Sequence, residues 1–291
     1  MLVGALKERV PNTLLMANQS IPTEATMAQL VRRLVEDIAM SEDAARWAVT
    51  SWAMALGLLP GLPASFSARE HLDNILRSPG YTPDKLIEFF KREFSKEYVA
   101  DAGVWEEYTV ERHTSMVMNQ FEKYFSRRSL PGDFKTDTFR VILALHDIGV
   151  FAAIEEGTKR GMEIKEAKKV GQAIYTTKLM EPAMEKLGFD RKEVDVAKAL
   201  VSDDLVGGYL RSGNFPTASL RRMARESGLP VLDFFDLLLV YYMVDAGSYT
   251  VDAGGKKGLD SLFVFEKHQM KMTFSPATLK KVNKLRESLE W

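Results

Sequence analysis

A histidine and an aspartate stand side by side at the end of an apolar segment in the middle of the chain, His146-Asp147. The apolar residues at positions 139, 142 and 143 precede His146 with the i, i+3, i+4, i+7 spacing of one helix face. Residues 139–149 are therefore predicted to form a buried helix with a polar pair at its inner end. Burying both side chains without polar partners would cost several kcal/mol. A divalent metal would satisfy them, because they offer a nitrogen and an oxygen donor; the alternative is a core histidine satisfied by its neighbour.

The composition excludes several classes of protein. The formal net charge is -1, so no global basic field favours binding to nucleic acid or to an anionic membrane surface. The chain has no cysteine, which excludes disulfides and thiolate metal ligands and suits a reducing compartment. The N-terminus lacks the apolar core of a secretory signal, and the most apolar run, Val231 to Val244, is too short to span a bilayer. We expect a cytoplasmic protein with no membrane span.

Residues 1–59 are predicted to form a separate helical unit. One helix is expected over Glu24–Met40, and a second follows with apolar residues at helical spacing. The segment Ala45–Gly57 of this second helix resembles a small helical module that is appended to varied bacterial signalling and conflict proteins. The resemblance implies an association role with a protein partner rather than chemistry. Trp47 and Trp52 are expected to fill the core of this unit.

A second domain is predicted over residues 80–291, after a linker and lead-in at residues 60–79. Two prolines and a glycine within Pro60–Pro63 cannot continue a helix. Thr82-Pro-Asp84 then has the residues of a helix start: a capping threonine, a proline and an acid. Strand signals are almost lacking, apart from a weak one at Leu262–Phe265. We therefore predict an all-α fold.

Two further helices of this domain offer candidate ligands. The expected helix Val110–Phe125 carries His113 on a face that it shares with Val117, four residues on. A capping-box pattern at Asp190–Glu193 begins another helix, whose inner stripe ends on Asp204. Asp203 lies on the neighbouring stripe, so periodicity leaves the two aspartates as alternatives.

The order of these residues resembles the HD superfamily of metal-dependent phosphohydrolases, whose pattern is H…HD…D in a helical bundle. The resemblance covers about residues 80 to 285. Four local phrases strengthen it: Val104–Thr114, Asn119–Phe125, Ala199–Leu210 and Asp245–Thr250. In the bacterial subfamily with similar phrases, the last ligand precedes a Gly-x-Tyr-Leu sequence, which selects Asp204 over Asp203.

The resemblance implies a bound divalent ion. The ligands that it implies are His113, His146, Asp147 and Asp204. Two imidazoles and two carboxylates form a mixed site that suits Mn, Fe, Co, Zn or Mg and leaves positions open for water. Such an ion lowers the pKa of bound water and polarises a phosphoryl oxygen. Asp147 and Asp204 are the candidate catalytic carboxylates, Asp204 either as a ligand or as the group that orients the nucleophile.

The sequence also departs from the family pattern. The usual phrase is His-Asp-Ile-Gly-Lys, but Val150 replaces the lysine, which removes a cation that could meet a substrate phosphate. Related sequences carry a further histidine where this chain has Ala173. Lys159, Arg160 or Glu155 are candidate substitutes, with Lys159 as a catalytic candidate, although residues 155–170 are so charged that a solvated surface is the default expectation. A Val150→Lys substitution is expected to raise turnover.

Two functions from different classes follow. The first is a metal-dependent phosphohydrolase that acts on a nucleotide or another small phosphoester, because the four implied ligands are present. The second is a degenerate, non-catalytic HD scaffold that binds a ligand or a protein partner, because Val150 and Ala173 replace expected residues. A nucleic-acid partner is not favoured, since no stripe of basic and aromatic residues is found.

Overall fold

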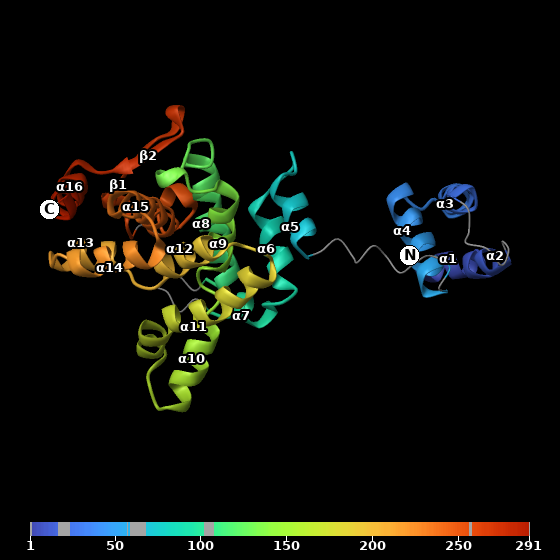
Figure 1. The fold of residues 1–291 in the computed structure, drawn as a ribbon, viewed down its shortest axis with the longest axis horizontal. Helices are drawn as coiled ribbons and strands as arrows, with labels where there is room; N and C mark the ends of the chain where they lie inside the picture. The colour runs from blue at the N-terminus through green and yellow to red at the C-terminus, as the bar shows by residue number, and fades with distance from the viewer. Residues whose placement is uncertain are drawn as a thin grey trace. The chain divides into compact units, whose positions relative to one another are not determined.

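The structure is a computed structural model that describes residues 2–16, 24–56, 58, 68–101, 108–255 and 258–290 (Figure 1). It is almost entirely helical, so the predicted all-α class is confirmed. The chain divides into two compact units, residues 1–71 and 72–291, and each is described here by itself. The predicted limits are 1–59 and 80–291, with a linker and lead-in at 60–79; residues 60–67 of that segment lie outside the described residues, and residues 68–76 form a helix.

In its described residues before position 59, the first unit is helical. The helices there are α1 (Leu2–Lys7), α2 (Val10–Met16), α3 (Glu24–Ile38) and α4 (Glu42–Ala55). Ser41 caps α4, since its side chain accepts a hydrogen bond from the Ala44 N–H. Leu14, Leu34 and Val49 are fully buried in the core of this unit. Trp52 packs against that core, but Trp47 is 50% exposed, so the expectation that both tryptophans fill it is wrong for Trp47.

The second unit holds the remaining helices and a small sheet. The helices are α5 (Ala68–Leu76), α6 (Pro83–Lys91), α7 (Ser95–Val99), α8 (Val110–Tyr124), α9 (Thr136–Leu145), α10 (Val150–Lys159), α11 (Ile164–Lys186), α12 (Arg191–Val201), α13 (Leu205–Ser212), α14 (Thr217–Ser227), α15 (Val231–Gly247) and α16 (Pro276–Glu290). Strands β1 (Phe263–Glu266) and β2 (Lys271–Phe274) pair antiparallel, with Phe263 opposite Phe274. The weak strand signal near Leu262–Phe265 is thus confirmed as an edge hairpin, and its partner strand had no sequence signal of its own.

The core of the second unit gathers around α8, α9 and α15, which come from distant parts of the sequence. Phe121 of α8 packs against Phe139 of α9, with ring centroids 5.0 Å apart. Phe234 and Phe235 of α15 are fully buried in the same core. Because α15 packs against neighbours along most of its surface, its sequence is apolar nearly all round rather than amphipathic.

The segment after α15 is fastened back onto α8. Asp252 accepts hydrogen bonds from the Tyr124 hydroxyl at 2.6 Å and from the Lys123 ammonium at 2.8 Å. These ionic contacts, together with burial of the carboxylate, fix the start of the loop that follows Asp245. The C-terminal end of α15 is therefore held beside α8.

Helices α10 and α11 run side by side as an antiparallel pair at the lower edge of Figure 1. Gly157 of α10 permits their close approach, because a Cβ atom there would lie 2.2 Å from the Cβ of Ala167. The charged stretch 155–170, expected as a solvated loop or exposed helix face, forms the end of α10, the turn and the start of α11. Most of its side chains are exposed or half-buried.

Of the helices in the described ranges, none is by itself long and apolar enough to cross a membrane. Helices α14 and α15 pass that test only when taken together, and they meet at a bend of 100°.

Candidate metal centre

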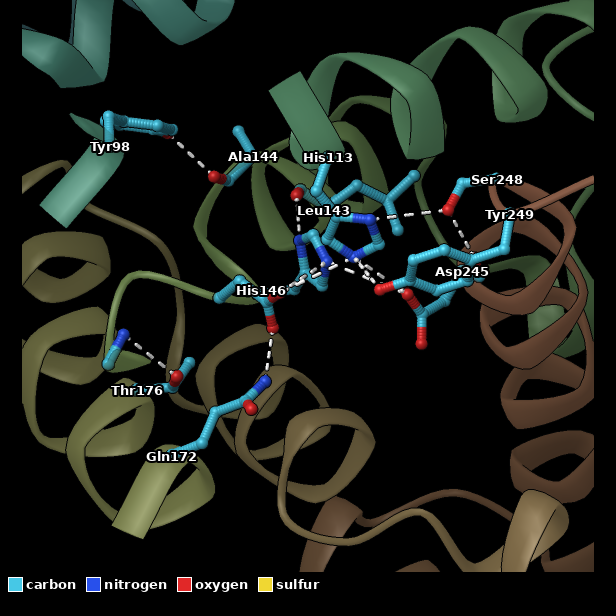
Figure 2. Close-up of polar contacts among 12 residues, drawn as sticks. Tyr98, His113, Leu143, Ala144, His146, Gln172, Thr176, Asp245, Ser248 and Tyr249 are labelled. Carbon is cyan, nitrogen blue, oxygen red and sulfur yellow. Dashed lines mark hydrogen bonds and ion pairs between the residues drawn. The ribbon is translucent and has the colours of Figure 1, made fainter. Parts of the chain in front are cut away.

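The last turn of α9 is built to present His146 inward. The final carbonyl groups of a helix have no partner within the helix. Here the Leu143 carbonyl accepts a hydrogen bond from His146 Nδ1 at 2.7 Å, and the Ala144 carbonyl accepts one from the buried Tyr98 hydroxyl at 2.7 Å. The helix end is therefore closed by side chains, one of which is the candidate ligand itself (Figure 2).

This arrangement fixes the tautomer of His146. Because Nδ1 donates its proton to the Leu143 carbonyl, the neutral ring carries its free lone pair on Nε2. Within the part of the chain that the structure describes, Nε2 is one of the few fully buried side-chain polar atoms with no hydrogen-bond partner. A buried lone pair without a donor is costly, so this nitrogen calls for a cation or a hydrogen-bond donor beside it.

The ring of His113, on α8, is oriented in the same way by Ser248. The Ser248 hydroxyl donates to the Asp245 carbonyl at 2.6 Å, so it can only accept at His113 Nδ1, 3.4 Å away. The His113 lone pair in the neutral form is then also on Nε2. The two imidazole rings lie 5.2 Å apart and face the same space (Figure 2).

Two carboxylates approach this pair of nitrogens. Asp147 Oδ2 lies 3.5 Å from His113 Nε2 and 3.7 Å from His146 Nε2. Asp245 Oδ1, at the C-terminal end of α15, lies 3.1 Å and 3.9 Å from the same two atoms. Among the described residues, His113, His146 and Asp245 form the group of donors whose ligand atoms all lie within 4.8 Å of one another.

These separations fit a shared metal ion. Ligands about 2.1 Å from a common ion lie roughly 3.0 Å apart at a right angle and roughly 4.2 Å apart when opposite each other. The four separations from 3.1 to 3.9 Å fall inside that range. The donor set of imidazole nitrogens and carboxylate oxygens suits Mn, Fe, Co or Zn. The buried cluster of His113, His146 and Asp245 could therefore hold a divalent metal, with Asp147 beside it.

The carboxylate of Asp147 is oriented by a hydrogen bond to the oxygen that faces away from the histidines, Oδ1. The Gln172 side-chain amide of α11 donates to Asp147 Oδ1, which leaves Oδ2 facing the histidines. One turn further along α11, the Thr176 hydroxyl accepts from the Gly149 N–H at 3.1 Å. A Cβ atom on Gly149 would lie 2.1 Å from the Thr176 nitrogen, so the glycine lets α11 seat directly on the His-Asp turn.

The protonation preferences of the cluster show how charges balance there. Burial disfavours the imidazolium form of His113, but the Asp245 and Asp147 carboxylates outweigh it and raise its pKa. Burial likewise favours the neutral acid at Asp147, but His146, His113 and Lys168 together hold its pKa below the usual value. Both shifts show that the carboxylates of the site favour positive charge between them, as a divalent ion would supply.

The opening of the site lies on the side of Asp245 and Tyr249. The Asp245 side chain is 34% exposed, whereas those of both histidines are buried. The Tyr249 ring stacks on His113 at 4.9 Å, and its hydroxyl lies 3.4 Å from His113 Nε2. The Tyr241 ring meets the edge of His146. Burial, with the Asp245, Asp147 and Asp204 charges close by, raises the Tyr241 pKa, so this phenol stays neutral.

Asp204, predicted as the last ligand, is not brought into this donor group. The prediction assumed that the helix continues to position 204, but α12 ends at Val201 and Asp204 begins α13 instead. Its Oδ1 accepts from the Gly207 N–H and its Oδ2 pairs with Arg211, both at 3.0 Å. The side chain is 53% exposed. Asp245 stands where Asp204 was expected, and Asp204 lies at the edge of the site.

The structure also corrects two expectations about cations. Lys159 pairs with Glu156 at 3.0 Å on the exposed end of α10. Nine residues of helix, about 13 Å, separate it from Val150 beside the His-Asp turn, so it is not a catalytic residue of this cluster. Val150 is fully buried in the core. A lysine there would bury a charge, so Val150→Lys is expected to destabilise the fold rather than to raise turnover.

Sequence reasoning therefore found three of the clustered residues and missed the others. His113, His146 and Asp147 meet as expected. In the sequence, Asp245 stands out only as the first residue of a family-like phrase. Gln172, next to Ala173, has no sequence signal of its own. The signal for Asp245 was present, because it directly follows the apolar run Val231–Val244 in the sequence, as His146 follows an apolar stripe.

Comparison of the chain with protein-family models, with curated proteins and with solved structures finds no match.

Proposed function

We propose that the chain is a metal-dependent phosphohydrolase of the HD type that acts on a nucleotide or another small phosphoester. The observation that carries the proposal is the buried His146 Nε2, which has no partner and faces a second imidazole and two carboxylates. Buried polar atoms usually have a partner, so an unpartnered nitrogen that faces three further donor groups supports a bound cation. The sequence order His113, His146-Asp147 and a later aspartate agrees with it.

The residues divide into ligands and supporting groups. His113, His146 and Asp245 would hold the ion, with Asp147 beside them, and the ion would supply a Lewis acid and a water of lowered pKa. Ser248 and the Leu143 carbonyl keep the Nδ1 protons in place, so both Nε2 atoms point at the site. Gln172 orients the Asp147 carboxylate.

The neighbouring groups suit a phosphoester that enters from solvent. Asp204 lies at the edge of the opening, near Asp245, where its carboxylate could accept a proton from an attacking water. The neutral Tyr241 phenol and the Tyr249 hydroxyl could contact a leaving-group oxygen. A buried apolar wall behind the histidines keeps bulk water from the far side.

The proposal is tested by metal-dependent phosphate release. The full chain, freed of metal by a chelator, is supplied separately with Mn²⁺, Fe²⁺, Co²⁺, Zn²⁺ or Mg²⁺ and screened against nucleotides and simple phosphomonoesters. We expect release only with a divalent ion, and none from a His146→Ala variant. Metal binding with no release from any phosphoester would contradict the enzyme and favour the non-catalytic scaffold, to which the buried Val150 already points.

A further inference from the structure

One face of α11 packs along the His-Asp turn, residues 146–149. Thr176, Gln172 and Lys168 lie four residues apart and share this face. Thr176 accepts a hydrogen bond from the Gly149 N–H, and Gln172 donates one to Asp147. Successive residues of this face, taken toward the N-terminus of α11, therefore lie closer to the metal centre. Lys168 is the next residue on the face, about 6 Å further along the helix axis.

The charge of Lys168 acts on the centre itself. Its charge is among those that lower the pKa of Asp147 and oppose the protonation of His113, which agrees with its place on the α11 face that contacts Asp147 through Gln172. Lys168 is half-buried, whereas the adjacent Lys169 is exposed. Lys168 is thus the lysine that α11 directs toward the site.

A lysine beside a divalent cation has no role in holding that cation, because like charges repel. It does suit an anion that binds the metal at the same time. The family phrase offers such a cation at position 150, where this chain has a fully buried valine.

We propose that Lys168 binds the phosphoryl group of the substrate beside the metal centre, in place of the cation that position 150 lacks. The inference rests on the proposed function, since it needs the metal. The ligand class is a phosphate monoester or orthophosphate, which share a dianionic phosphoryl group.

The test compares an anion with a cation. By Coulomb's law, removing the charge of Lys168 should weaken the binding of orthophosphate but not the binding of Mn²⁺. Orthophosphate is titrated calorimetrically into the Mn²⁺-loaded full chain and into Lys168→Gln, Lys168→Arg and the matched control Lys169→Gln. Mn²⁺ affinity is measured for each metal-free protein. We expect Lys168→Gln to weaken phosphate binding about tenfold or more, while its Mn²⁺ affinity stays equal or rises. Lys168→Arg keeps the cation and is expected to retain most of the phosphate affinity, and Lys169→Gln to change it less than about twofold.

Four results would overturn the inference. Equal losses in Lys168→Gln and Lys169→Gln would indicate only a general effect of net charge. Weaker binding of both Mn²⁺ and phosphate in Lys168→Gln would indicate structural damage. A wild-type chain that binds Mn²⁺ but not orthophosphate would refute the role of Lys168 and leave the metal centre intact, whereas a chain that binds no Mn²⁺ would refute the proposed function as well.

Discussion

At the scale of single residues, the structure and the sequence differ on which later aspartate is a metal ligand, Asp245 or Asp204. Asp245 contacts both histidines, whereas Asp204 is engaged by Arg211 and by a backbone N–H. Asp245→Asn removes a charged donor and is expected to lower Mn²⁺ affinity about 100-fold or more, since even supporting groups are worth 10- to 100-fold. Asp204→Asn is expected to change it less than about threefold. Calorimetric titration of the two isosteric variants makes the comparison.

The reverse order of effects would restore the ligand that the sequence suggested. The structure keeps Asp204 out of the donor group for a local reason. The stripe that leads to Asp204 is real up to Val201, but the helix stops there and the chain turns. Periodicity tells which face a residue occupies only while the helix lasts. His146 was predictable because it directly follows the apolar stripe of α9 as the helix C-cap with helical φ and ψ, so the periodicity still holds there.

At the scale of secondary-structure elements, capped helices were predictable and their close packing was not. The capping box at Asp190 and Glu193 is present as expected. The contact of α11 with the His-Asp turn had no sequence signal, because it depends on the absence of a side chain at Gly149. Sequence periodicity reports which residues are buried, but not which helix buries them.

Gly149→Ala tests that contact. The added Cβ would overlap the backbone of α11 at Thr176 and Gln172, so the helix must move away from the turn. We expect a loss of about 1–3 kcal/mol in the free energy of unfolding, typical of overpacking, together with weaker metal binding as Gln172 leaves Asp147. Denaturant unfolding and metal titration measure the two effects. Gly208→Ala, where a Cβ meets open space, is the matched control.

Glu193 links the start of α12 to α9 and gives a pH dependence. Burial favours its neutral form, but hydrogen bonds from the Thr138 hydroxyl, Lys135 and the Asp190 N–H outweigh it and lower its pKa. Since the folded-state pKa lies below the unfolded value of about 4.3, the ionised Glu193 stabilises the fold above that pH. This stabilisation is lost as pH falls through the folded-state pKa.

Glu193→Gln is therefore expected to lower the free energy of unfolding by about 1–2 kcal/mol at pH 7. It should also make the decline of stability below about pH 4.5 less steep than in the wild type. Thermal unfolding at a series of pH values measures both. A variant with unchanged stability at pH 7 and an unchanged acid limb would show that the carboxylate contributes nothing.

At the scale of the whole molecule, every donor of the metal centre lies in the second unit. The contact division falls at residue 71, within α5, so a fragment of residues 68–291 keeps that helix whole. We expect this fragment to unfold cooperatively and to bind Mn²⁺ within about threefold of the full chain, because it retains its own core. An insoluble fragment, or one without near-UV circular dichroism, would show that the second unit depends on the first.

The account depends above all on one property of the chain: that two lone pairs and two carboxylates face a common point in order to bind a cation. Equilibrium titration of the metal-free full chain with Mn²⁺ and Zn²⁺, read by metal content after desalting, measures it directly. We predict one ion per chain in the wild type and none in a His113→Ala/His146→Ala double variant that remains folded. A wild type that retains no divalent ion under any condition, or a double variant that retains it equally, would contradict the account.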